Sequence, residues 1–188
     1  MKIITAIISI ILLNFVSPLK GQGDHVKKFP EDWLGVWQGN LEIYSGQTLV
    51  QKVPMKLEHS ATDSNDLYIW ALIYGEDEVK GRRDYRLQPV DKSKGHWVVN
   101  EQNSILLDAF IYENQLISNF GIVDEDPKKS TNLMSSYRLE GNDLVFEIWV
   151  FAGDPVRKSG GIELNAEKIP LVYAYPARGY QRAVLKKM

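Results

Sequence analysis

From Trp33 onward, apolar and polar residues alternate with a period of two, which is the pattern of β-strands that bury one face. Turn-forming residues interrupt this alternation roughly every ten to twelve residues, which is the spacing of consecutive hairpins. Examples are Ser45-Gly46, Gln102-Asn103 and Gly141-Asn142. The pattern predicts about ten antiparallel strands. Their expected ranges are 34–44, 47–58, 67–75, 79–90, 95–101, 104–113, 116–124, 131–140, 143–152 and 172–186.

One connection, residues 154–171, is too long to be a tight turn. It contains Pro155, Pro170 and the run Ser159-Gly160-Gly161, all of which interrupt regular structure. A connection of this length often has a function of its own. We therefore expect this segment to hold a short helix or to act as a flap.

The fourth predicted strand shows which face of the sheet is turned outward. Its alternate residues form a charged or polar set, Lys80, Arg82, Asp84, Arg86 and Gln88, and a second set, Val79, Gly81, Arg83, Tyr85 and Leu87. A face as charged as the first set cannot contact lipid, so the pattern excludes a transmembrane barrel. Closure of the strands removes exposed sheet edges. We therefore expect an all-β fold, an antiparallel up-and-down β-barrel of about eight to ten strands.

The N-terminus has the features of a secretion signal. Lys2 precedes an apolar run from Ile3 to Val16, and Gly21-Gln22-Gly23 supplies the small residues that signal peptidase recognises. The run is shorter than the roughly 20 residues of a membrane-spanning helix. We expect residues 1–23 to be a cleaved signal peptide, 24–32 an N-terminal tail and 33–188 a single barrel domain. The product would be exported, to the periplasm or outside the cell.

Composition and charge limit the possible partners. The 188 residues carry a formal net charge of −2, and removal of the leader with Lys2 and Lys20 makes it −4, so nucleic acid is not an expected partner. The chain has no Cys, which excludes disulfides, thiolate nucleophiles and Cys-ligated zinc. Stability must therefore come from a buried core.

The first strand begins with Gly35-Val36-Trp37-Gln38-Gly39, a Gly-x-Trp-x-Gly sequence. This start resembles that of the calycin barrels, which include lipocalins, fatty-acid-binding proteins and nitrobindin-like haem proteins. The resemblance implies that Trp37 closes one end of the barrel, with Gly35 and Gly39 letting the chain bend beside it. A typical lipocalin would add a Thr-Asp-Tyr-type turn, which this sequence lacks.

Histidine positions bear on cofactors and metals. Nitrobindin-like barrels bind haem through a His near the C-terminal strand, but His25, His59 and His96 are the only histidines here. Haem is therefore not expected, and no cofactor is predicted. The three histidines show no metal-binding spacing, so we expect each to be a surface or turn residue and predict no metal site.

The fourth and fifth strands place polar residues on the expected inner face. A symmetric hairpin through 91–95 puts Tyr85 opposite Glu101, with Arg83 diagonal to it and Trp97 on the same face. Because a buried charge must be compensated, Arg83 and Glu101 form either an internal ion pair that fixes the barrel register or an anchor for a ligand carboxylate or phosphate. Arg83-x-Tyr85 resembles the Arg and Tyr pair of fatty-acid-binding proteins.

Further candidates come from other strands. Arg182 is expected on the inner face of the last strand or, equally, on its outside. Asp108 lies between Leu106 and Phe110 on a partly apolar face. Most strand aromatics are expected in the core. The candidate ligand-binding residues are Arg83, Tyr85, Trp97, Glu101, Trp70, Asp108, Phe120, Trp149 and Arg182.

Two functions fit this sequence. The first is an exported lipocalin-like barrel that binds a small apolar or amphipathic molecule, whose head group could be acidic. The alternative is a filled barrel that acts through its surface as an interaction or assembly module. No catalytic motif such as Gly-x-Ser-x-Gly, Gly-Lys-Ser/Thr or His-Glu-x-x-His occurs, so an enzyme is not predicted.

Overall fold

The computed structural model describes residues 28–126 and 128–188. The expected signal peptide, residues 1–23, and His25 lie outside them. The elements in chain order are η1 (Glu31–Trp33), β1 (Gly35–Ser45), β2 (Thr48–Ala61), β3 (Tyr68–Tyr74), α2 (Glu78–Gly81), β4 (Arg82–Asp91), η2 (Lys92–Lys94), β5 (His96–Asn100), β6 (Leu106–Tyr112), β7 (Gln115–Ile122), β8 (Thr131–Glu140), β9 (Asp143–Ala152), β10 (Arg157–Ser159), β11 (Glu163–Leu164), β12 (Glu167–Lys168), β13 (Val172–Ala174) and β14 (Ala177–Lys187).

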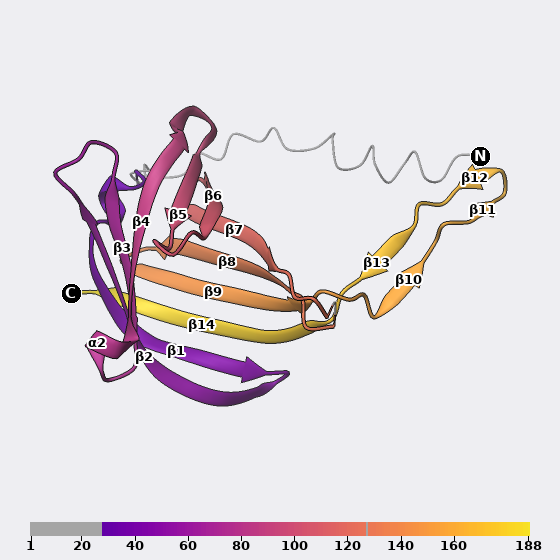
Figure 1. Ribbon diagram of the computed structural model, residues 1–188, viewed down its shortest axis with the longest axis horizontal. Coiled ribbons are helices and arrows are strands. Elements are labelled where there is room, and N and C mark those ends of the chain that lie inside the picture. The colour runs from indigo at the N-terminus through magenta and orange to yellow at the C-terminus, as the bar shows by residue number, and fades with distance from the viewer. Residues whose placement is uncertain (1–27, 127) are drawn as a thin grey trace.

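Ten of these strands form a closed antiparallel barrel, which confirms the predicted fold class (Figure 1). Each barrel strand pairs with its neighbours along the chain, and β14 closes the barrel against β1 and β9. Nine of the ten predicted strands match observed barrel strands within a few residues, whereas the range 172–186 is divided between β13, which lies outside the barrel, and β14, which begins at Ala177. One difference occurs before β4, where Asp77 accepts a hydrogen bond from the Lys80 amide and caps the helical turn α2, so β4 begins at Arg82.

The inner face follows the predicted alternation. Met55 and Leu57 of β2 and Leu87 of β4 are fully buried, and the pairing of Leu57 with Leu72 continues this core into β3. In β14 the inward residues are Ala183 and Leu185, which pair with Phe146 and Leu144 of β9. The core therefore runs around the barrel as one cluster.

Trp37 lies buried near the start of β1. It is 2% exposed, and its indole Nε1 donates to the Trp33 carbonyl at 2.8 Å. A Cβ at Gly39 would lie 2.4 Å from the Val184 carbonyl oxygen, and Gly35 has a φ of +138°. Only glycine allows this approach of β1 to β14 and this backbone angle.

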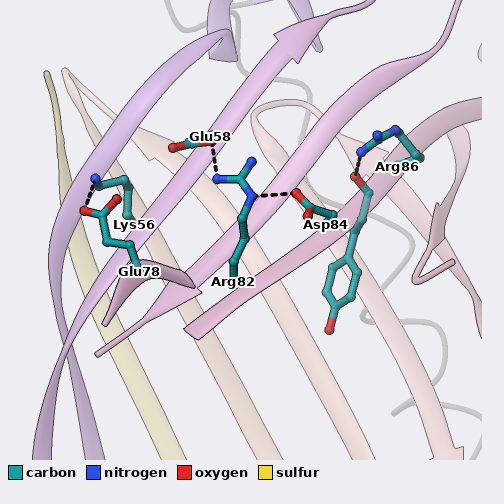
Figure 2. Close-up of polar contacts among 7 residues, drawn as sticks. Lys56, Glu58, Glu78, Arg82, Asp84 and Arg86 are labelled. Carbon is teal, nitrogen blue, oxygen red and sulfur yellow. Dashed lines mark hydrogen bonds and ion pairs between the residues drawn. The ribbon is translucent and has the colours of Figure 1, made fainter. Parts of the chain in front are cut away.

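Charged side chains cover part of the outer face (Figure 2). Ala71 and Ile73 of β3 point outward yet are buried. Arg82 bridges Glu58 at 2.8 Å and Asp84 at 2.6 Å, and these two carboxylates flank Ala71 in the strand pairing. Lys56 and Glu78 form a further pair at 2.6 Å beside Ile73. The charges predicted to face water do so and also shield apolar residues beneath them.

Residues 154–171, for which we expected a short helix or a flap, contain no helix and belong to a longer segment, 153–176, which we call the arm. β10 pairs with β13 and β11 with β12, so the segment is a long hairpin that projects away from the barrel at the right of Figure 1. In the described residues, no helix is long and apolar enough to cross a bilayer.

Candidate functional site

A cavity of about 160 Å³ lies inside the barrel. Its lining comes from the inner faces of β3 to β9, together with Glu101, which follows β5 directly. The connections β1–β2, β3–β4, β5–β6, β7–β8 and β9–β14 lie at the end of the barrel away from Trp37, and we call this end the mouth. Tyr74 and Glu101 stand where their strands reach the mouth. The cavity is therefore placed as in a ligand-binding barrel.

Aromatic rings form the deep wall of the cavity. The Trp70 ring packs edge-on against Tyr137 with centroids 5.0 Å apart, and Tyr137 packs on Phe146 at 4.8 Å. Burial raises the pKa of Tyr137 well above its usual value, so this phenol stays neutral. Interlocked rings lose contacts when they move, so the wall is preorganised.

Aliphatic side chains form the rest of the apolar lining, and one of them is small. Ala109 is 1% exposed and lies on the cavity, where a larger residue would fill space. The remaining aliphatic lining residues are Leu72, Val99, Leu107, Leu116 and Ile148. The cavity is thus mainly apolar, which suits a hydrocarbon or aromatic ligand body.

Polar groups gather on the side of the cavity near β4 and β5. Glu101 is partly buried, and its Oε2 accepts a hydrogen bond from Asn103 Nδ2 at 3.3 Å. Burial is the main cause of the raised pKa of Tyr85, the Glu101 charge adds to it, and Arg83 opposes it. Burial likewise raises the pKa of Tyr74. Ser118 Oγ already donates to the Asp108 carbonyl at 2.6 Å. Glu101 is the one carboxylate among the lining residues described.

Four predicted site residues line the cavity: Trp70, Tyr85, Glu101 and Phe120. The predicted register also holds, because Arg86 pairs with Asn100 and Leu87 with Val99, and continuation of this ladder puts Tyr85 opposite Glu101. Trp97 is buried on the inner face as expected, but it does not line the cavity. Its ring packs against that of Phe29, with centroids 4.9 Å apart.

Arg83 lies on the face that the alternation assigned to it, opposite Leu72, but its side chain does not line the cavity. Its side chain is exposed, and Nη1 donates to the carbonyls of Lys80 at 3.1 Å and Arg82 at 2.9 Å. The helical turn α2, which the alternation did not predict, brings these carbonyls to the guanidinium. No ion pair joins Arg83 to Glu101 among the contacts of the described residues.

Three other candidates, Asp108, Trp149 and Arg182, lie on the outer face. The Oδ1 atom of Asp108 lies 2.6 Å from Nε2 of His96. Trp149 packs against Tyr180, with ring centroids 4.2 Å apart, and Arg182 Nε lies 4.0 Å from Glu147 Oε1. The alternation alone did not fix which face of β9 or β14 is inward, because both faces carry apolar residues.

His59 contradicts the expectation of a surface or turn residue. It is 1% exposed, and its ring lies 4.8 Å from that of Trp70 and 5.8 Å from that of Tyr68. Neither ring nitrogen has a hydrogen-bond partner within the described part of the chain. Burial lowers the pKa of His59 to about 4, and the nearby Trp33 carbonyl offsets this only in part.

Sequence reasoning missed Tyr74, Ser118 and Ser135 as lining residues. The signal for Tyr74 was present, since Tyr68, Trp70, Leu72 and Tyr74 alternate along one face of β3. Small hydroxyl residues such as the two serines occur on either face of a strand, so nothing in the alternation marked them.

Within residues 28–126 and 128–188, no cluster of three or more His, Asp or Glu is arranged to hold a metal ion. Comparison of the chain with protein-family models and with curated proteins gives no match. What is established is the architecture: the chain is a closed ten-stranded antiparallel barrel, compatible with a calycin-like fold.

Proposed function

We propose that this protein is an exported, lipocalin-like barrel that binds a small amphipathic molecule in its interior. The observation that supports this most is the cavity of about 160 Å³ with an aromatic wall and one carboxylate beside it. A filled barrel, the alternative function, would lack such a space.

The cavity volume limits the size of the ligand. A cavity of about 150 Å³ lined by apolar side chains is enough to hold benzene. A ligand with one aromatic ring or a short alkyl chain therefore fits, whereas most of a long fatty acid would remain outside.

The polar lining limits the head group. Arg83 donates to backbone carbonyls outside the cavity, whereas Glu101 lines it. A carboxylate attracts ammonium groups and hydrogen-bond donors and repels acids, and the aromatic rings add cation–π attraction. We therefore propose a head group that is cationic or donates hydrogen bonds, in place of the acidic head group considered from the sequence.

The test is titration of the purified protein with three probes of one size: benzylamine, benzyl alcohol and benzoate. We expect dissociation constants of about 0.1 to 1 mM for the first two, in line with −4 to −5.5 kcal/mol, and weaker binding of benzoate. Tryptophan fluorescence should change on binding, because Trp70 lines the cavity.

Variants locate the binding event. Trp70→Phe should remove most of the fluorescence change, whereas Trp149→Phe on the outer face should leave it. Ala109→Leu should fill the cavity and abolish binding, and Glu101→Gln should remove the preference for benzylamine over benzyl alcohol. Calorimetry that finds no heat of binding for any probe would refute the proposed function. Equal binding of all three probes would refute only the head-group assignment.

A further inference from the structure

The arm exposes more apolar surface than any other part of the described chain of similar length. Seven large apolar side chains in it are between 44% and 71% exposed: Val156, Ile162, Leu164, Leu171, Val172, Tyr173 and Tyr175. All residues of β10, β11, β12 and β13 are exposed. A two-stranded hairpin without a covering layer is at best marginally stable in water. The arm therefore has the composition of a surface that becomes covered.

The root of the arm carries an apolar face next to the barrel. Lys158 pairs with Tyr173, and its ammonium lies 5.8 Å from the centre of the Tyr173 ring. Val156 and Tyr175 lie two positions along the two strands from this pair, so they share its face. The other face at this level carries Arg157 and Ser159 together with their partners Ala174 and Val172. Exposed apolar side chains therefore lie on both faces of the hairpin where it leaves the barrel.

The barrel of the same molecule does not cover this face. Ala152 donates to the Pro176 carbonyl at 3.0 Å and Gly153 to the Ser130 carbonyl at 2.8 Å, which fixes the base of the arm. From this base the hairpin runs away from the barrel (Figure 1). Among the described residues, no other element packs over the arm.

We propose that the arm joins two copies of this chain, with the arms lying side by side and antiparallel about a two-fold axis. The exposed apolar residues of the arm are two tyrosines and five aliphatic residues, and a half-exposed tyrosine carries on the order of 100 Å², an aliphatic side chain less. Each arm thus presents a few hundred Å² of apolar surface, which is the size of a weak, concentration-dependent interface. A two-fold axis lets the same surface serve both copies.

The charge distribution of the arm favours an identical arm as partner. The root carries Asp154, Arg157 and Lys158, a net charge of +1, and the tip carries Glu163, Glu167 and Lys168, a net charge of −1. Antiparallel packing puts each acidic tip beside the basic root of the other copy. The arm as a whole has no net charge, so charge gives no support to nucleic acid or an anionic membrane as its partner.

The experiment measures the molar mass of the purified protein by sedimentation equilibrium over a range of concentrations. We expect a dimer whose dissociation constant rises at least tenfold in Tyr173→Asp and in Leu164→Asp, with the urea midpoint of the barrel unchanged. The matched control is Tyr112→Asp, which changes a 63% exposed apolar residue of β6 outside the arm and should leave the dimer intact.

Charge reversal tests the antiparallel arrangement directly. Lys158→Glu and Glu163→Lys should each weaken the dimer. The double variant should restore it, because the root is then acidic, the tip is basic, and the two again attract each other between copies. A monomer at every concentration would overturn the proposal, and so would a dimer that both arm substitutions leave unchanged. Binding of the monomer to neutral lipid vesicles through the arm, with no dimer in solution, would assign the surface to a membrane and would equally overturn it.

Discussion

Burial of His59 predicts that the barrel loses stability in mild acid. In the folded state burial lowers the pKa of His59 to about 4, whereas an unfolded chain leaves it near its usual 6.5. At a pH between these two pKa values, His59 is protonated in the unfolded state and neutral in the folded state. Stability from this group is therefore complete above about pH 6.5 and declines as the pH falls towards 4.

The size of the effect follows from the same two values. Each pKa unit corresponds to about 1.4 kcal/mol, so the gap is worth about 3 kcal/mol in the free energy of unfolding. Other groups also make the free energy of unfolding depend on pH in acid. Hydrogen bonds hold the pKa values of Glu42 and Asp77 below their usual values, so the stability that these two carboxylates contribute is lost as the pH falls through their folded pKa values. A comparison with a variant that lacks only the buried imidazole separates the two contributions.

The variant is His59→Phe, which replaces a ring that has no hydrogen-bond partner among the described residues by an apolar ring of similar shape. At pH 7 we expect it to be as stable as the native protein or more so, because no buried hydrogen bond is lost. Urea unfolding at pH 7, 6, 5 and 4.5, followed by tryptophan fluorescence, should show the advantage of the variant growing by 2 to 3 kcal/mol, as expected for about two pKa units.

A control at the outer surface checks that the change comes from burial. His96→Gln should retain the acid sensitivity, because His96 stacks on Phe110 on the outside of the barrel. If the difference between the native protein and His59→Phe is the same at pH 7 and pH 4.5 within about 0.5 kcal/mol, the reasoning is wrong.

Three further predictions concern the barrel and its export. Trp37→Ala should lower the free energy of unfolding by about 3 to 5 kcal/mol in urea melts, as for other large buried aromatics, while Val36→Ala on the outer face should cost less than about 1 kcal/mol. Gly39→Ala should destabilise strongly because its Cβ would lie 2.4 Å from a carbonyl oxygen of β14, whereas Gly179→Ala, which meets nothing closer than 3.8 Å, should fold normally and serve as its control in thermal melts. N-terminal sequencing of the exported protein should begin at or near Asp24, and an intact Met1 on that product would contradict the predicted leader.

Much of the barrel could be predicted because its strands are amphipathic and its turns are short. The ranges 131–140 and 143–152 were predicted as β8 and β9 have them, since Gly141-Asn142 marks the turn between them. Strand pairing then follows, because each hairpin fixes the register of the next strand. The arm was not predicted as a hairpin, since its glycines, prolines and short strands give little periodicity.

The cavity depends on interactions that alternation does not describe. Tyr85 and Glu101 reached it because the β4–β5 ladder keeps the predicted register beyond a bulge between Pro89 and Asp91, whereas Arg83 did not because backbone carbonyls of Lys80 and Arg82 accept hydrogen bonds from its guanidinium. A guanidinium that finds carbonyls near solvent avoids the desolvation cost of an apolar interior. His59 shows the reverse case, in which packing against Trp70 and Tyr68 holds a polar ring inside without partners among the described residues.

These two side chains differ in what burial does to their charge. Arg83 cannot release its proton at ordinary pH, so burial would require a charged partner, and the exposed position is favoured. Imidazole can lose its proton near neutral pH, so His59 is buried in its neutral form. Burial therefore lowers the stability of the fold only when acid protonates the ring. Glu101 lies between these cases, partly buried and bonded to Asn103. It keeps access to water while lining the cavity, which is where a ligand ammonium or hydroxyl could reach it without leaving solvent entirely.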